Sequence, residues 1–401
     1  MIKRIRIRDF KSIRELDLEL DPVTVLVGRS GTGKSNLVQA IRFLRNYLLN
    51  PQEAVNYEFG WARIIPVGES EPKTLIEVTF SVPSEERDYN YQICFQKRPG
   101  HGDPSLQAES LRLGNECLFS REILQDKQFS VYGQGPHWRW QTPPKVTPQP
   151  GFTDTPMLGS FPSLQQVVFA YAALSAGIGY YHLPSTVLGI VRGQEHGEQF
   201  LKTIPGLSDN ASNYREVMRS ITQDFRRANI RKSLLASLQA VNPGISSIEL
   251  DSLTNPQRAI IAHKTGDRVF ELSLEQESDG LRRFYAHLLA LYQNPSKLTL
   301  VFEEPENAIF PGALSLLAEE FQATAREERG QVILTTHNPI FLDSFDVDNI
   351  RAVEMRDGAT VVGRVSKEQR QAVKDRLLTT GELLTIDRAR LDDEAKPQQA
   401  A

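Results

Sequence analysis

The first fifty residues carry two kinds of periodicity. Residues 2–8 alternate isoleucine with arginine, and residues 16–20 alternate leucine with acidic side chains, which is the pattern of strands with one buried face. Residues 23–27 are rich in β-branched side chains without alternation, as in a strand that is buried on both faces. Residues 36–49 place leucine and isoleucine at helical spacing. The pattern therefore predicts two half-buried strands, a central strand and an amphipathic helix.

The same periodicities continue along the chain. Helical spacing is predicted from residue 162 to about 240, including a buried apolar run at 167–181, and again from 279 and over 312–326. Six prolines between residues 136 and 156 favour an extended connector. Further strands are predicted at residues 74–82, 89–95, 106–113, 129–132, 245–251, 258–264, 268–274, 298–302 and 331–335. The mixture indicates an α/β protein.

A glycine-rich octapeptide joins the predicted central strand to the predicted helix. Glycines let successive backbone N–H groups turn toward a phosphate, and the positive end of the following helix points at the same place. Lys34 is expected to reach the β- and γ-phosphates and the Ser35 hydroxyl to bind Mg²⁺, with Asn36 completing the predicted ATP-binding set. The alternative is a chance glycine-rich turn. The P-loop pattern G-x-x-x-x-G-K-[ST] is matched in full by Gly28, Arg29, Ser30, Gly31, Thr32, Gly33, Lys34 and Ser35.

Two neighbouring carboxylates close an apolar strand far down the chain. Glu303 and Glu304 follow Leu300–Phe302 directly. At the carboxyl end of a strand in a P-loop fold, the first carboxylate holds Mg²⁺, usually through water, and the second orients and deprotonates the attacking water. The alternative is an acidic turn in solvent.

Two further motifs are ambiguous when each is taken alone. His337 follows the apolar strand at 331–335 and is either a γ-phosphate contact or a structural histidine. Ser278, in Ser278–Gly280, either caps the helix that begins there or offers that helix N-terminus to the γ-phosphate of another subunit.

Composition narrows the class of protein. The 401 residues carry 46 basic and 50 acidic side chains, a net charge of −4, which excludes a histone-like protein held to nucleic acid by bulk charge. Cys94 and Cys117 provide neither a disulfide framework nor a metal spacing. The first eight residues lack the apolar segment of a signal peptide, and the run at 167–181 is too short to span a bilayer. We expect a cytoplasmic protein without membrane contact.

The order of these motifs resembles that of ABC-type P-loop ATPases of the RecF, RecN, SMC and OLD group. It is most similar to bacterial relatives with an AAA-type core, found in DNA repair and antiphage defence. The opening at residues 5–13, followed by the P-loop, is typical of this group, and the resemblance is specific over 1–45 and 275–345. It implies a P-loop NTPase fold of the RecF/ABC type, with a mixed sheet, an antiparallel β-lobe and an inserted helical lid.

The resemblance also assigns a role to each motif in one site. Lys34 and Ser35 would bind phosphate and Mg²⁺. Glu303 would be the metal carboxylate, Glu304 the catalytic base and His337 the switch histidine. The implied cofactors are therefore ATP and Mg²⁺.

The remaining motifs imply a dimer. Ser278 and Gly280 would be the signature that completes a neighbour's site, and Glu306–Ala308 would be the D-loop at the dimer seam. Two chains would then sandwich two ATP molecules head to tail, closing with ATP and loosening on hydrolysis.

Three positions depart from the family pattern. Glu303 replaces the commoner aspartate, Glu277 stands where the signature usually has leucine, and Phe310 stands where close relatives often carry histidine. No Q-loop glutamine can be assigned. These departures favour slow hydrolysis and a weak signature.

The resemblance leaves two functions open. The first is an ATP-gated dimer that acts on DNA or on an effector protein, such as a nuclease or toxin, in DNA repair or phage defence. The second is a nucleotide-locked clamp that holds a partner with negligible hydrolysis. The nucleotide subunit of a membrane transporter is disfavoured. Only 64 residues follow His337, too few for the nuclease domain of OLD proteins, so we expect any cutting to be done by a partner.

Three surfaces are candidates for DNA contact, each with a simpler alternative. The predicted helix at 214–232 is rich in arginine but resembles a solvated helix face. The arginines of residues 2–8 would line a groove or merely face solvent. Trp138 and Trp140 would stack on bases or pack within a β-hairpin.

The predicted domains follow from these motifs. Residues 1–100 are the N-terminal part of the ATPase head, and 101–245 are an insertion of β-hairpins, proline-rich connector and helical lid. Residues 246–385 are the C-terminal part of the head, and 386–401 are a disordered tail.

Overall fold

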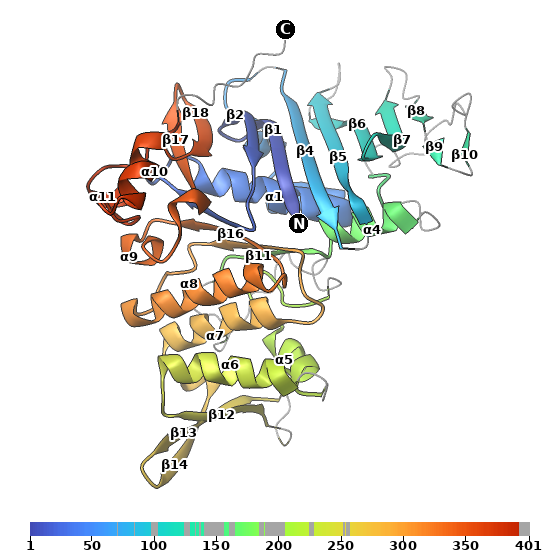
Figure 1. Cartoon of the computed structure of the whole chain (residues 1–401). Coiled ribbons are helices and arrows are strands. Elements are labelled where there is room, and N and C mark those ends of the chain that lie inside the picture. The colour runs from blue at the N-terminus through green and yellow to red at the C-terminus, as the bar shows by residue number, and fades with distance from the viewer. Residues whose placement is uncertain are drawn as a thin grey trace.

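The computed structural model is shown in Figure 1. Most of the proline-rich connector, Trp140 and residues 224–227 lie outside the described residues. The structure describes residues 1–69, 71–83, 85–97, 103–123, 129–132, 134–135, 138–139, 156–159, 165–183, 188, 205–223, 228–251, 253 and 257–392.

One sheet of the described chain is antiparallel and has seven strands. Its strands are β1 (Ile2–Phe10), β2 (Ile13–Glu19), β4 (Lys73–Val82), β5 (Glu85–Lys97), β6 (Pro104–Leu113), β7 (Glu116–Ile123) and β8 (Phe129–Tyr132), in the order β2-β1-β4-β5-β6-β7-β8. A short pair, β9 (Gln134–Gly135) and β10 (Trp138–Arg139), follows β8. The isoleucines of β1 are buried and its arginines are exposed, so the predicted alternation is confirmed.

A second, mixed sheet of six strands carries the candidate site. Its strands are β3 (Val23–Val27), β11 (Ile178–Tyr181), β15 (Thr299–Glu303), β16 (Gln331–Thr336), β17 (Ile350–Arg356) and β18 (Ala359–Arg364). Their order is β11-β15-β16-β3-β17-β18, with all neighbours parallel except β17 and β18. Val25 packs into one core and Leu26 into the other, which explains why this strand shows no alternation.

Helices cover both faces of the mixed sheet. Helix α1 (Lys34–Leu49) lies between the two sheets, and its Leu37 and Ile41 are buried in a core shared with β1, β15 and β16. Helices α2 (Pro51–Tyr57), α3 (Trp61–Ile64) and α4 (Gln165–Leu174) pack into the same core. The opposite face is covered by α7 (Asp279–Tyr292) and α8 (Pro311–Arg326).

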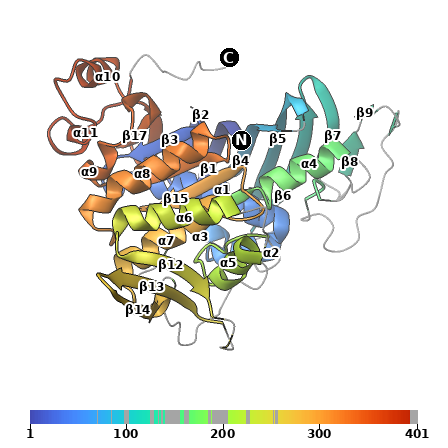
Figure 2. The same ribbon diagram turned by 60° about the horizontal axis from the view of Figure 1, so that its bottom comes forward.

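A further layer lies below α7 and α8 in Figure 1 and comes to the front in Figure 2. It consists of α5 (Tyr214–Gln223), α6 (Ala228–Val241) and the antiparallel sheet β12 (Ile245–Leu250), β13 (Ala259–Thr265) and β14 (Arg268–Ser273). Leu234 and Leu238 of α6 share one hydrophobic core with α7 and α8. The expected helical lid therefore packs directly on the head.

Two expectations for the chain need correction. The apolar run at 167–181 is not one helix: α4 ends at Leu174, and Ile178–Tyr181 forms the edge strand β11. The segment after residue 385 is not disordered throughout: Leu391 is buried and pairs with Val365. Residues 393–401 lie outside the described residues.

The C-terminal lobe that holds this segment was not anticipated. It contains β17, β18, α9 (Pro339–Leu342), α10 (Lys367–Lys374) and α11 (Glu382–Thr385), at the left of Figure 1. The buried amide of Gln369 donates to the carbonyl oxygens of Asp387 and Arg388, at 3.1 and 2.7 Å. These bonds fix the segment beyond α11 against α10.

Candidate functional site

Parallel strands bring the predicted motifs to one edge of the mixed sheet. Thr335 lies opposite Glu303 on one side, and Thr336 lies opposite Val27 on the other. The P-loop begins directly after Val27, and His337 follows Thr336. The carboxyl ends of β3, β16 and β15 therefore gather the phosphate loop, the histidine and the paired carboxylates.

Two glycines of the P-loop pack closely against the neighbouring strands β17 and β18. Gly33 has φ 93°, and a Cβ there would lie 1.9 Å from Oγ1 of Thr360. A Cβ on Gly28 would lie 2.3 Å from the carbonyl oxygen of Val353. Thr360 in turn donates a hydrogen bond to the carbonyl oxygen of Thr32, at 2.8 Å. Larger residues would displace the loop from β17 and β18.

Lys34 begins helix α1 and turns back over the loop. Its Nζ donates to the carbonyl oxygens of Gly28 and Arg29, at 2.7 and 3.0 Å. Burial lowers the pKa of Lys34, and the nearby carboxylates of Glu304 and Glu306 partly oppose that shift. The lysine from the start of the chain thus lies close enough to the carboxylates from its far end to interact with them electrostatically.

Glu304 is held from three sides. Its backbone N–H donates to the carbonyl oxygen and to Oγ1 of Thr335, at 3.2 and 3.1 Å, and its φ is 47°. Nδ2 of Asn307 donates to Oε2 of Glu304 at 2.9 Å. Nδ1 of His337 lies 3.2 Å from Oε1. The side chain remains 37% exposed, so the carboxylate is both oriented and accessible to water.

Glu306 is buried beneath these groups. Its Oε1 accepts hydrogen bonds from Oγ1 of Thr336 at 2.6 Å and from the backbone N–H of His337 at 3.1 Å. Burial raises the pKa of Glu306, and these two donors partly oppose that effect. The first residue of the predicted D-loop therefore fixes the backbone that carries His337 within the same chain.

Glu303 faces a strand that sequence reasoning missed. The hydroxyl of Tyr180, from β11, donates a hydrogen bond to Oε2 of Glu303. Nδ1 of His182 lies 3.7 Å from the same oxygen. Neither residue was predicted as part of the site, because 162–240 was interpreted as helical.

The donors at this edge fit a magnesium ion. Ser35 offers a hydroxyl and Glu303 a carboxylate, which are hard oxygen donors. Mg²⁺ in nucleotide sites keeps several waters and takes only one or two protein ligands beside the phosphates. The described residues contain no cluster of three or more His, Cys, Asp or Glu that would hold a metal by itself.

Ser278 and Gly280 lie at the start of α7, apart from the P-loop. Oγ of Ser278 accepts from the backbone N–H of Leu281 at 3.3 Å, so the predicted helix cap is confirmed. A Cβ on Gly280 would lie 2.9 Å from the carbonyl oxygen of Ala308. Neither residue has a hydrogen bond to the P-loop in the described chain. Glu277 is tied to His263, at 2.6 Å, rather than facing solvent.

A hollow of about 670 Å³ opens beside the P-loop. Gly28–Thr32 and His337 form one wall, and the ends of β17 and α11 form the other. Arg388 and Arg390 belong to the second wall. The segment expected to be a tail therefore borders the candidate site.

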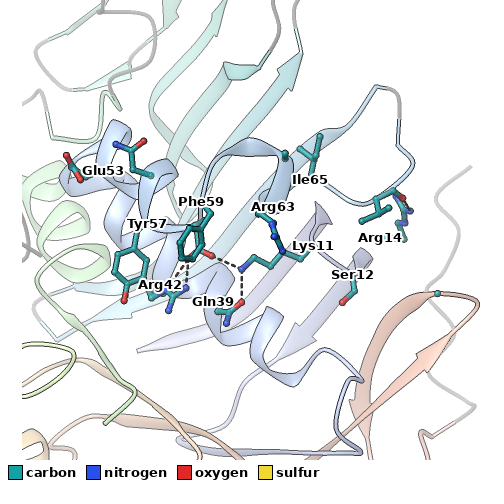
Figure 3. Close-up of a pocket in the computed structure, with 15 residues that line it drawn as sticks. Lys11, Ser12, Arg14, Gln39, Arg42, Glu53, Tyr57, Phe59, Arg63 and Ile65 are labelled. Atoms are coloured by element: carbon teal, nitrogen blue, oxygen red, sulfur yellow. Dashed lines mark hydrogen bonds and ion pairs between the residues drawn. The ribbon is translucent and has the colours of Figure 1, made fainter. Parts of the chain in front are cut away.

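A larger hollow of about 860 Å³ lies beside helix α1 and is drawn in Figure 3. Lys11 donates to Gln39 and Glu58 along its floor, at 2.7 and 2.6 Å. Phe59 lies on its wall with 87% of its surface exposed and φ 61°, a conformation that aromatic residues rarely adopt. Ser12, also in its lining, accepts a hydrogen bond from Asn36, so this hollow adjoins the first turn of α1.

Several basic side chains of the candidate DNA surfaces already have partners within the chain. The arginines of β1 form ion pairs across the sheet: Arg4 with Asp17, Arg6 with Asp17 and Glu77, and Arg8 with Glu15. On α5, Arg215 pairs with Glu275 and Arg219 with Gln257. Within the predicted basic helix at 214–232, the structure describes α5 and the start of α6, and residues 224–227 lie outside the described residues. These contacts favour the structural interpretation of both surfaces.

Comparison with known proteins agrees with this geometry. A family model described as an AAA ATPase domain matches residues 1–126. The family model for the AAA domain assigned to the AbiEii toxin of Type IV TA systems matches residues 198–343. The two matches contain the P-loop and the Glu303–His337 motifs, and they indicate an ATPase.

Two curated relatives extend the comparison. The OLD nuclease of Thermus scotoductus is 21% identical over 400 residues, which cover 93% of this chain and 66% of that protein. The chain thus spans slightly less than two thirds of that relative. The DNA replication and repair protein RecF of Acidothermus cellulolyticus is 50% identical over 44 residues, 11% of this chain and 12% of RecF. The resemblance to the RecF, SMC and OLD group is confirmed.

A solved structure establishes the fold. An SMC head bound to the C-winged helix domain of ScpA superimposes with a TM-score of 0.50 and 16% identity, covering 92% of this chain and 99% of the other. The fold is that of an SMC-type P-loop head, as the motif order predicts. Within the described residues, no helix combines the length and the apolar character needed to cross a bilayer.

Proposed function

We propose that this chain is a Mg²⁺-dependent ATPase whose P-loop, paired carboxylates and His337 act on one bound nucleotide. The observation that carries the proposal is the parallel pairing of β3, β16 and β15, which brings the P-loop, Glu304 and His337 to one edge of the sheet. A lysine, a hydroxyl and two carboxylates at one sheet edge form the set of groups that phosphoryl transfer to water requires.

Each group then has a chemical task. Lys34 neutralises charge on the β- and γ-phosphates, while Ser35 and Glu303 hold Mg²⁺. The ion, when bound, supplies further charge neutralisation on the phosphate oxygens. Glu304 takes the proton of the attacking water as the bond from the γ-phosphorus to the β–γ bridging oxygen breaks. His337 holds Glu304 and contacts the released phosphate.

The nucleoside of the bound ATP would lie in the hollow of Figure 3. Its lining begins at Ser12, which is hydrogen-bonded to Asn36 in the first turn of α1, close to where the phosphates would bind. Phe59 offers an exposed ring for stacking, and Arg63 adds a cation at the same wall.

Two chains would complete the site as a head-to-tail homodimer. Ser278 is exposed and is held at the N-terminus of α7, where it could meet a second chain. A helix N-terminus favours a negative charge, such as a γ-phosphate. ATP would then close the dimer and hydrolysis would loosen it.

We infer a role in the cytoplasm, in DNA repair or phage defence, with DNA or an effector nuclease or toxin as the partner. The motif order and the names of the relatives support this role. Direct DNA binding would be weak, because the basic side chains on β1 and α5 are already paired. It would require ATP and would fall steeply with added salt.

A nucleotide-locked clamp is the second candidate. It is favoured by Glu303, which stands in place of the commoner aspartate, and by Glu277, which is paired with His263. Phosphate release by the purified protein, with Glu304→Gln as the control, separates the two functions. An ATPase releases phosphate at a rate that Glu304→Gln abolishes while ATP-dependent dimers persist. Equal and negligible release from both proteins would support the clamp.

A further inference from the structure

The edge strand β11 places a buried tyrosine beside the candidate metal carboxylate. β11 runs parallel to β15, with Tyr180 opposite Val301, so the carboxyl ends of both strands meet. Tyr180 is 1% exposed, and its hydroxyl donates to Oε2 of Glu303.

A chain of side chains fixes the tyrosine ring in turn. The guanidinium of Arg42 lies 4.8 Å from the centre of the Tyr180 ring. Nε of Arg42 donates to Oε1 of Glu58 at 3.2 Å, and Nζ of Lys11 donates to Oε2 of Glu58 at 2.6 Å. Glu58 is only 4% exposed. Packing and paired charges thus hold Arg42 against the ring.

The longer side chain at position 303 explains why such support is needed. Glutamate has one more rotatable bond than the aspartate common in the family, so its carboxylate has more orientations to lose when it binds a metal. A fixed donor on Oε2 selects one orientation and leaves Oε1 as the oxygen available to a metal ion. The Tyr180 hydroxyl therefore compensates for the extra methylene.

We propose that Tyr180 is a positioning residue for Glu303, holding its carboxylate ready for Mg²⁺ with Arg42 as support. This inference rests on the proposed ATPase function. It concerns the metal affinity of the site, whereas binding of the nucleotide itself depends on the P-loop.

The neighbouring tyrosine provides a matched control. Tyr181 lies on the same strand, is also 1% exposed, and its hydroxyl accepts from Nε2 of Gln293 at 2.7 Å, away from Glu303. Tyr180→Phe and Tyr181→Phe each remove one buried hydroxyl and keep the ring. A purely structural effect would lower the melting temperature of both without changing the response to metal.

The experiment measures nucleotide binding at increasing Mg²⁺ in the Glu304→Gln background, which removes hydrolysis from the readout. Tyr180→Phe is expected to raise the Mg²⁺ concentration for half-maximal ATP binding about tenfold, the effect of losing a hydrogen bond to a charged group. The affinity for metal-free ATP should not change. Tyr181→Phe should change neither value.

Glu303→Asp supplies a second test. The shorter side chain cannot reach Tyr180 in the same way, so adding Tyr180→Phe to Glu303→Asp should change the Mg²⁺ requirement less than twofold. Equal Mg²⁺ requirements for the two tyrosine variants, or fully additive effects with Glu303→Asp, would overturn the proposal. Failure of the Glu304→Gln protein to bind ATP at any Mg²⁺ concentration would instead remove the ATPase function and this inference with it.

Discussion

Nδ1 of His337 lies 3.2 Å from Oε1 of Glu304, although the two residues end different strands. The contact is set by the register of β15 and β16, which places Glu303 opposite Thr335. His337 therefore has a task toward the carboxylate as well as toward a phosphate. This pairing turns an ambiguous histidine into a candidate member of the reaction site.

Replacing His337 with alanine tests that assignment. Loss of the histidine should lower the rate of phosphate release about 100-fold, the usual contribution of a group that orients a general base. ATP affinity should change only a few-fold, because Lys34 and the loop remain intact. Single-turnover phosphate release and nucleotide titration measure the two effects. An unchanged rate of phosphate release would show that His337 has only a structural role.

Mixing two inactive variants tests the head-to-tail dimer. Lys34→Ala removes the phosphate contact of one chain, and Ser278→Glu places a negative charge where the partner's γ-phosphate would bind. Each variant alone should be inactive. In the mixed dimer, the intact loop of one chain faces the intact Ser278 of the other, so a 1:1 mixture should recover about one quarter of the wild-type phosphate release. A mixture that stays inactive would argue against sharing of the site.

Phe59 reports on the placement of the nucleoside. Its alanine variant should weaken ATP binding about tenfold, which is the effect expected for loss of one stacked aromatic ring. Leu377→Ala is a suitable control, because Leu377 is also a large exposed side chain, at 76%, and does not line either hollow beside the P-loop or α1. Fluorescence titration with a labelled ATP measures both. Equal ATP affinities for the two variants would show that the nucleoside does not stack on Phe59.

The buried histidine His287 is expected to make the folding stability of the protein fall at acid pH. It is buried between Phe302 and Phe321, and burial lowers the pKa of its ring to about 3. Because the folded pKa lies below the unfolded value near 6.5, His287 costs no stability above pH 6.5 and destabilises the fold as the pH falls toward 3.

The size of the loss of stability follows from the difference between the folded and unfolded pKa values of His287. Between pH 7 and pH 5, His287 should remove about 2 kcal/mol of folding free energy, at about 1.4 kcal/mol per pH unit below 6.5. A His287→Leu variant should lose correspondingly less stability over that interval, whatever its stability at pH 7. Urea unfolding at both pH values measures the difference. Identical losses in the two proteins would contradict the assignment.

Much of the fold was predictable because it follows from sequence patterns that each span only a few residues. The alternation in β1, the apolar strands β3, β15 and β16, and the P-loop each occupy a short window, and all appear as predicted. Their meeting at one edge follows from parallel pairing, which the family resemblance supplies. The gathering of Lys34, Glu304 and His337 near one sheet edge was therefore predictable from the sequence, and their catalytic roles stay predictions.

Strand β11 and the lobe around β17 could not be predicted, because their roles depend on contacts between residues far apart in the sequence. β11 has only four residues and is separated from the apolar run of α4 by only three residues, Ser175–Gly177. Tyr180 gains its importance only from the neighbouring strand. In β17, Arg351 is 1% exposed and bonds to Asp21, so a charged residue occupies a position that the pattern would mark as exposed. The strand and the lobe around it were missed for that reason.

The most direct test of the shared pocket is retention of γ-labelled ATP by Glu304→Gln protein after rapid gel filtration in Mg²⁺. We predict that the variant retains one intact ATP per chain, and that adding Lys34→Ala abolishes retention, since the lysine and the carboxylate act on the same nucleotide. Release of labelled phosphate by Glu304→Gln at the wild-type rate, or undiminished retention by the double variant, would contradict the account.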